Sequence, residues 1–252
     1  MMHNYLLIIQ YDGSNYNGWQ IQNNNKNTLQ ETLQNALSTA LNCSIHLIAS
    51  GRTDSGVHAL KQYANFHCNI SINFSLFLST INNILPEDIR IFSIREVASN
   101  FHSRYSAKSK TYTYTICNDL SNHVFTRKYS HYISTSLNID LMRTATKLFI
   151  GTYDFTNFTN SHNDKSKIRT IYDISIDTIY KNNIKHIIIS YNGNGFLYNM
   201  VRIISGTLVD IGLEKINLSD IEELLTYTSS RKRYKAGELL PAQGLCLKDV
   251  YY

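Results

Sequence analysis

The order of hydrophobic patterns in the first hundred residues constrains the fold of this chain more than any other feature. Four stretches there are typical of β-strands and two have the 3.6-residue spacing of a helix. In chain order they are strand 3–11, helix 29–40, strand 45–49, strand 59–68, helix 74–81 and strand 89–97. This β-α-β-β-α-β order predicts a split ferredoxin-like unit.

The second half of the chain also mixes strands and helices. We expect strand 110–117, helix 137–149, a hairpin of 168–180 with 184–191, helix 196–211, helix 218–227 and strand 244–251. The prediction is therefore an α+β protein of two α/β lobes, built on a mixed and largely antiparallel sheet. We place the domains at residues 1–99 and 100–252, with a cleft between the lobes as the expected active site.

Composition indicates a globular chain that does not enter a membrane. Of 252 residues 43% are hydrophobic and 17% are charged, and no run approaches the ~20 apolar residues of a membrane span. The first residues lack the basic region and apolar core of a secretory signal. The four cysteines lie far apart and form no C-x-x-C pair, so we expect reduced thiols in a cytoplasmic protein.

Charge is concentrated in the second half of the chain. Formal net charge is +5, and residues 127–252 carry 16 Lys and Arg against 12 Asp and Glu. The densest basic cluster is Arg231-Lys232-Arg233-Tyr234-Lys235. It is compatible with a solvated helix end or with a surface that contacts phosphates, and both interpretations stay open at this point.

One loop between predicted strands has the composition of a reactive site. Residues 51–58 read Gly-Arg-Thr-Asp-Ser-Gly-Val-His. Asp54 is bracketed by Gly51 and Gly56, which allow sharp turns and close approach of a ligand. Arg52 supplies a permanent positive charge that favours an ionised Asp54. Taken alone, however, an Asp-Ser-Gly triplet between strands is typical of an ordinary turn.

Several further segments accompany this loop, and together they resemble the tRNA pseudouridine synthase A family from residue 11 to the last few residues. The segments are Tyr11-Asp12-Gly13 with Gly18-Trp19-Gln20, the octapeptide at 51–58, Phe101-His102-Ser103-Arg104, Lys110-Thr111-Tyr112-Thr113-Tyr114, Gly193 to Gly206, and Gly244-Leu245-Cys246-Leu247. Ser103 stands where the family often has Ala. We expect Trp19 to be a packed anchor in its glycine-bounded loop.

The resemblance implies a role for particular residues. By this resemblance, Asp54 would be the essential catalytic residue, and Tyr112 would stack on the target uracil and assist removal of the proton from C5. Arg202 would pair with Asp54. From its pattern alone, an Arg in an apolar helix needs a carboxylate partner but does not specify which one. Leu245 would shape the pocket wall, and Arg52 would brace the loop or hold the extruded nucleotide.

The resemblance also implies the activity and the partners. Uridines at positions 38, 39 and 40 of the tRNA anticodon stem-loop would be isomerised to pseudouridine by a homodimer. The reaction requires no cofactor and no metal, because nothing is oxidised, hydrolysed or transferred to another molecule. Arg231, Lys232 and Arg233 are then candidates for contacts with the tRNA backbone.

Two other classes of function remain possible at this point. A noncatalytic RNA-binding module would keep the basic surface and the aromatic strand but would have no use for Asp54. A hydrolase such as a glycosidase would use Asp54 with a second carboxylate roughly 5–9.5 Å away. No motif nominates that second acid.

Overall fold

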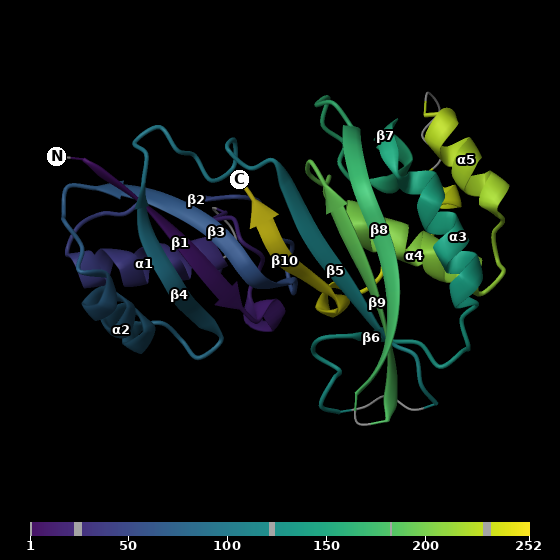
Figure 1. Ribbon diagram of the computed structural model, residues 1–252, viewed down its shortest axis with the longest axis horizontal. Helices are drawn as coiled ribbons and strands as arrows, with labels where there is room; N and C mark the ends of the chain where they lie inside the picture. The colour runs from purple at the N-terminus through teal and green to yellow at the C-terminus, as the bar shows by residue number, and fades with distance from the viewer. Residues whose placement is uncertain (1, 23–26, 121–123, 182, 229–232) are drawn as a thin grey trace. The chain divides into compact units, whose positions relative to one another are not determined.

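The described part of the chain is α+β, as predicted. The computed structural model describes residues 2–22, 27–120, 124–181, 183–228 and 233–252, which form ten strands and five α-helices (Figure 1). The chain divides into two compact units, and each is described by itself below. Unit 1 comprises Met1–Lys108 with Cys246–Tyr252, and unit 2 comprises Ser109–Leu245.

Unit 1 contains the split β-α-β-β-α-β motif. Its elements in chain order are β1 (His3–Tyr11), α1 (Leu29–Leu41), β2 (Ile48–Ala49), β3 (His58–Cys68), α2 (Phe74–Ile84) and β4 (Ile89–Val97). Strand β1 lies between β4 and β3 and is antiparallel to both, and β2 pairs antiparallel with β3. The strand order β4-β1-β3-β2 is therefore that of a ferredoxin-like sheet. Helices α1 and α2 lie side by side (Figure 1).

The last strand of the chain returns to unit 1. In β10 (Leu245–Tyr251), Cys246 and Leu247 pair in parallel with the first two residues of β3. The segment between β4 and β5 is also joined to this strand, because the Lys108 N–H donates to the Tyr251 carbonyl. The units therefore differ from the predicted division into 1–99 and 100–252, at residues 100–108 and at the C-terminal strand. These long-range pairings leave no trace in local periodicity.

Helix α1 explains why strand 45–49 is shorter than predicted. The expected strand would begin at Ile45, but only Ile48–Ala49 is in the sheet. The Ile45 N–H donates to Ser38 Oγ (3.1 Å), and the Leu47 N–H donates to Gln34 Oε1 (3.0 Å). Side chains of α1 thus satisfy the backbone groups that a sheet partner would otherwise bind.

Unit 2 is built on an antiparallel sheet with the order β5-β9-β8-β7. Its longer elements are β5 (Ser109–Cys117), α3 (Ile139–Phe149), β7 (Gly151–Asp154), β8 (Ile168–Lys181), β9 (Ile184–Gly193), α4 (Met200–Gly212) and α5 (Leu218–Thr226). The short β6 (His131–Tyr132) pairs in parallel with β5. The predicted hairpin is confirmed, because β8 and β9 pair in antiparallel fashion from Lys181 with Ile184 at the turn to Ile171 with Gly193.

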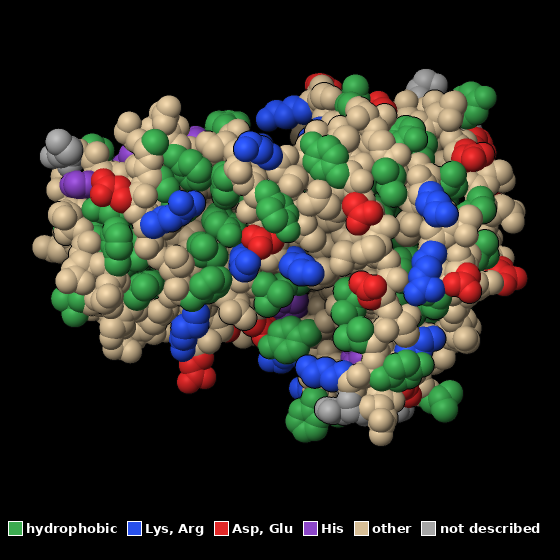
Figure 2. All heavy atoms as spheres, in the orientation of Figure 1, with side chains coloured by type: hydrophobic (Ala, Val, Ile, Leu, Met, Phe, Trp, Pro, Cys, Tyr) green, Lys and Arg blue, Asp and Glu red, His purple; other side chains and the backbone are tan. Residues whose placement is uncertain are grey.

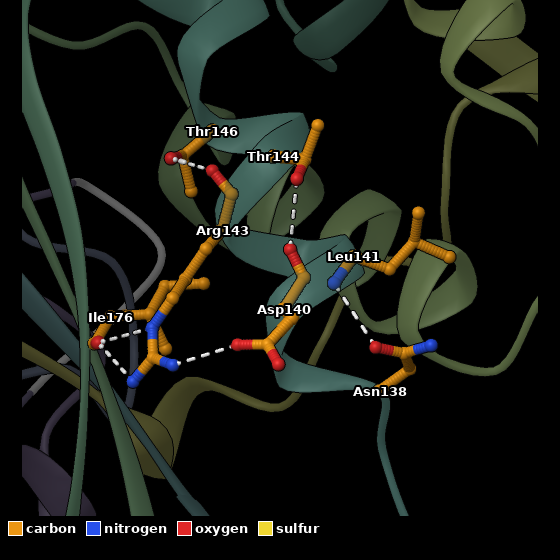
Figure 3. Close-up of polar contacts among 7 residues, drawn as sticks. All are labelled: Asn138, Asp140, Leu141, Arg143, Thr144, Thr146 and Ile176. Atoms are coloured by element: carbon orange, nitrogen blue, oxygen red, sulfur yellow. Dashed lines mark hydrogen bonds and ion pairs between the residues drawn. The ribbon is translucent and has the colours of Figure 1, made fainter.

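Arg143 joins helix α3 to β8 by hydrogen bonds. Arg143 Nε and Nη2 both donate to the Ile176 carbonyl at 3.3 Å, and Nη1 lies 3.0 Å from Asp140 Oδ1 (Figure 3). Asn138 caps the same helix by accepting the Leu141 N–H. The cap places the start of the helix at Ile139, two residues later than predicted.

Helix α4 also begins later than predicted, at Met200 rather than Phe196. Its N-cap, Asn199, has a left-handed backbone (φ 63°) that cannot continue a helix toward the N-terminus. Its core face is formed by residues spaced as the helical period requires, because Met200, Ile203, Ile204 and Leu208 are all fully buried. None of the helices in the described residues is long and apolar enough to cross a membrane.

Candidate active site

Asp54 lies in a closed turn between β2 and β3. The Val57 N–H donates to the Asp54 carbonyl (3.1 Å), and Gly56 adopts the positive φ (77°) that the third position of such a turn requires. Asp54 is half-buried, whereas Arg52 is exposed. The ordinary-turn interpretation is therefore correct for the backbone of this loop.

A buried polar network lies beneath this loop. Gln62 of β3, which is fully buried, accepts from Ser50 Oγ (2.6 Å) and donates to the Gly51 carbonyl (2.9 Å). The Tyr11 hydroxyl lies 2.8 Å from Thr53 Oγ1, and burial raises the pKa of Tyr11, which therefore stays neutral. These bonds fix Ser50, Gly51 and Thr53, three of the four residues before Asp54.

A second segment holds the loop from the side. The Trp19 N–H donates to the Thr53 carbonyl (3.0 Å), and Ser55 Oγ donates to the Tyr16 carbonyl (3.1 Å). Gly18 has a left-handed backbone (φ 81°), and a Cβ there would lie 2.9 Å from the Thr53 oxygen. Trp19 is 1% exposed, so its predicted role as a packed anchor is confirmed.

His58 ends the loop and starts β3. Its Nδ1 lies 3.1 Å from both the Gly13 backbone nitrogen and Asp12 Oδ1. An unprotonated Nδ1 accepts from the Gly13 N–H, whereas a protonated Nδ1 donates to the Asp12 carboxylate. Either contact joins the Asp12–Gly13 segment to the end of the Asp54 loop.

In unit 2 the candidate tyrosine is packed within the sheet. Tyr112 of β5 is 8% exposed and pairs with Tyr191 of β9. Phe196 meets its ring edge-on, with centroids 5.4 Å apart and planes at 84°. Tyr114, two residues further on, is buried on the same face of β5, and its hydroxyl donates to the Pro241 carbonyl.

Arg202 lies in the first turn of α4 and is half-buried. Its Nε donates to the Leu240 carbonyl (2.7 Å), and its Nη1 donates to Asn199 Oδ1 (3.2 Å). These two acceptors orient the guanidinium. Leu245, at the start of β10, is 6% exposed.

The described members of the basic cluster contact the protein itself. Arg233 Nε donates to Asn160 Oδ1 (3.2 Å) and Nη1 to the Gly237 carbonyl (3.1 Å), while Lys235 pairs with Glu223. Arg231 and Lys232 lie outside the described residues. Elsewhere, Figure 2 shows Lys and Arg side chains at many separate places on the drawn face, several beside hydrophobic side chains.

The predicted site residues thus come from both units. Arg52 and Asp54 share one loop of unit 1, and Tyr112, Arg202 and Leu245 belong to unit 2. The pairing of Asp54 with Arg202 stays a prediction.

The cysteines have the character of structural residues. All four are free thiols. Burial raises the pKa of the Cys246 thiol to about 12 and also raises that of Cys68. Because the thiolate is the nucleophilic form, neither of these two cysteines is a nucleophile at neutral pH.

A family model for tRNA pseudouridine synthase matches residues 7–106 and 145–252. The chain belongs to the tRNA pseudouridine synthase family. It is 43% identical over its full length to tRNA pseudouridine synthase A 1 of Clostridium tetani and 44% identical to tRNA pseudouridine synthase A of Clostridium acetobutylicum, with complete coverage of both chains in each case. A third relative, tRNA pseudouridine synthase A of Acetivibrio thermocellus, is 43% identical, again with both chains covered completely.

Membership of the tRNA pseudouridine synthase family makes the chain an isomerase. The matched segments contain Arg52, Asp54, Arg202 and Leu245. Tyr112 lies in the interval between them, which only the full-length relatives cover.

Sequence reasoning missed Gln62 as a residue that positions the site. A signal was present, since Gln62 is in phase with Ala64 and Phe66 on the buried face of β3. A polar amide at an inward position must find partners, and here its partners are Ser50 and Gly51 of the Asp54 loop.

Proposed function

We propose that this chain isomerises uridine to pseudouridine at positions 38, 39 and 40 of the tRNA anticodon stem-loop, with Asp54 as the catalytic residue. The observation that carries the proposal is the Asp54 loop. A half-buried carboxylate stands on a loop without regular structure that buried hydrogen bonds hold from beneath and from the side. Such rigidity is what a catalytic group needs to meet its substrate in one geometry.

The reaction is an exchange of bonds within one nucleotide. The C1′–N1 bond of uridine breaks, the uracil turns, and C5 forms a new bond to C1′ with loss of the C5 proton. In this proposal an ionised Asp54 either attacks the sugar or takes a proton from it while the glycosidic bond breaks. No atom leaves the nucleotide other than a proton that exchanges with water.

Arg202 and Tyr112 complete the proposed chemistry. An Arg202 guanidinium paired with Asp54 would favour the ionised carboxylate and offset the cost of removing it from water. Tyr112 would stack on the uracil and assist proton removal from C5. The uridine must leave its helix, at a cost of a few kcal/mol, and stacking returns about 1–3 kcal/mol of that.

Arg52 fits a contact with the nucleotide better than a role in bracing the loop. Its side chain is exposed and makes no hydrogen bond or ion pair with the residues that the structure describes. The loop is already held by other groups, so the guanidinium is available to a phosphate. Leu245 would contribute an apolar wall.

The sites of modification test the proposed specificity. Bulk tRNA that lacks pseudouridine at positions 38–40 is incubated with the purified chain, and pseudouridine is mapped by chemical labelling and sequencing. We expect new pseudouridine at positions 38, 39 and 40. Modification confined to other positions, or none at all, would contradict the proposal.

A tyrosine substitution separates stacking from proton transfer. Tyr112→Phe keeps the ring but removes the hydroxyl, so we expect normal tRNA affinity with slower release of tritium from C5-labelled uridine. Turnover equal to that of the original chain would show that the hydroxyl is not the base.

We further propose that the enzyme is a homodimer, acts in the cytoplasm on tRNA, and contacts the tRNA backbone through Arg231, Lys232 and Arg233. Sedimentation should give twice the chain mass of 29.0 kDa.

Because Arg233 also bonds Asn160 and Gly237, the test of the backbone contact neutralises only Arg231 and Lys232. The salt dependence of tRNA affinity should then flatten, and an unchanged slope would indicate a solvated surface.

A further inference from the structure

The segment between β4 and β5 contains a turn that is anchored at its base. Ser106 N–H donates to the His102 carbonyl (2.8 Å), and the His102 N–H donates back to Ser106 Oγ (3.2 Å). Between them Ser103 is fully buried, its N–H donates to Asn65 Oδ1 (2.8 Å), and its carbonyl accepts from the Tyr252 hydroxyl (2.9 Å). The turn is thus fixed to β3 and to the C-terminal residue.

The tip of the same turn presents an aromatic ring to solvent. Tyr105 is 77% exposed, yet the His102 ring packs against it in a tilted arrangement, with centroids 4.3 Å apart and planes at 34°. The Arg104 guanidinium carbon lies 5.7 Å from the Tyr105 ring centroid. Arg104 is also exposed, so the Tyr105 ring and the Arg104 guanidinium are accessible side by side to a ligand.

The His102 ring is itself held in place. Its Nδ1 accepts the backbone N–H groups of Arg104 (3.2 Å) and Tyr105 (3.3 Å). A nitrogen that accepts is unprotonated, so the ring orientation is tied to the backbone of the turn. Single exposed tyrosines are common on proteins. Tyr105, however, packs against the fixed His102 ring and lies beside Arg104. This arrangement is preorganised to bind a flat, charged ligand.

The charge in the chain on both sides of the turn fits an anionic ligand. Residues 95–108 contain three Lys or Arg, at positions 95, 104 and 108, and one acidic residue, Glu96, which lies 2.7 Å from His3 Nδ1. Nucleotides combine a flat base with a negatively charged phosphate, and unstacked bases bind exposed aromatic and Arg side chains.

We propose that Arg104 and Tyr105 bind one unstacked nucleotide of the RNA substrate, separate from the target uridine. Tyr105 stacks on the base, and Arg104 binds the adjoining phosphate. This site rests on the proposed function, because it takes the substrate to be tRNA. This site contributes to the affinity for the RNA and to the position in which the RNA is bound, and it takes no part in the chemical step.

The test is the affinity of the full chain for an unmodified tRNA transcript, measured by fluorescence anisotropy at three salt concentrations. Tyr105→Ala should raise Kd about 5- to 150-fold, the range for loss of one stacked base. Tyr105→Phe should stay within about 2-fold, because the ring remains. Arg104→Gln should lower the slope of log K against log salt by about one phosphate contact.

Tyr180→Ala is the matched control, since Tyr180 is 71% exposed and belongs to unit 2. It should leave Kd unchanged. A Tyr105→Ala protein that binds within about 2-fold of the original chain, or an equal loss in Tyr180→Ala, would overturn the proposal. Tritium release by the original chain is measured in parallel. Normal binding without release would contradict the proposed isomerisation while leaving the binding comparison valid.

Discussion

The loop that carries Asp54 and the helix that carries Arg202 are held in place by different forces. Hydrogen bonds of Gln62 and Tyr11 hold the loop, which has almost no regular structure. Helix α4 is held by an apolar face in which Ile204 and Leu208 are fully buried. Hydrogen bonds are directional and specify a position, whereas apolar burial supplies more free energy with less directional specificity.

This comparison predicts that core substitutions in α4 chiefly cost stability, while polar substitutions under the loop chiefly cost activity. The two kinds of variant can be told apart by measuring the free energy of unfolding and the rate of tritium release on the same protein.

The largest expected effect on stability is at α4. Ile204→Ala leaves a cavity in the core of unit 2 and should lower the free energy of unfolding by about 2–5 kcal/mol, measured by urea titration. Leu76→Ala is the control, because Leu76 is 67% exposed and should change stability by less than about 0.5 kcal/mol. Equal changes in both proteins would contradict the apolar account of α4.

A smaller loss of stability and a clear loss of activity are expected at Gln62. Gln62→Leu keeps the volume but leaves the Gly51 carbonyl and the Ser50 hydroxyl without this partner, at a cost of about 1–3 kcal/mol. The loop should shift, and kcat should fall roughly 10- to 100-fold at a temperature where the variant is folded.

A buried amide of unit 2 provides the control for Gln62. Asn118 is 7% exposed and donates to the carbonyls of Ile133 (2.9 Å) and Thr135 (2.8 Å). Asn118→Leu should lose similar stability and keep its kcat. If both variants lose kcat equally, the effect is general destabilisation and the positioning role of Gln62 is wrong.

The smallest expected effect comes from two buried serines of unit 1. Ser50 Oγ bonds Gln62, whereas Ser103 Oγ is buried without a hydrogen-bond partner among the described residues. Ser103→Ala should therefore raise the free energy of unfolding by about 0.5–1 kcal/mol, and Ser50→Ala should lower it by about 1 kcal/mol. A loss of stability in both variants would indicate that Ser103 has a partner after all.

Local patterns predicted much of this fold because the relevant forces are local. Thr28 caps α1 by accepting the Glu31 N–H, as its spacing indicates, and β1 and β4 match their predicted bounds. The face shared by Tyr112 and Tyr114 follows from the two-residue period of a strand. Asp54 is also found where the glycine-bracketed motif places it, in a turn between two strands.

The remainder depends on contacts between residues distant in the sequence. Ile45 and Leu47 lie outside the sheet because α1 side chains bind their backbone groups, and no strand pattern reports that competition. Strand β10 joins β3 although the paired residues, Cys246 and His58, are 188 positions apart in the sequence. Gln62 shows its role only once its partners in the loop are known.

The central claim is that Asp54 is the catalytic carboxylate on this ordered loop. Its most direct test is Asp54→Asn, assayed for tRNA binding and for tritium release from C5-labelled uridine, beside Asp249→Asn, a half-buried Asp of unit 1 paired with Lys61. We predict that Asp54→Asn binds tRNA but releases tritium at least about 1,000-fold more slowly, since loss of an essential nucleophile or base removes most of the rate enhancement. Asp249→Asn should remain active. Equal release by Asp54→Asn and the original chain would contradict the account.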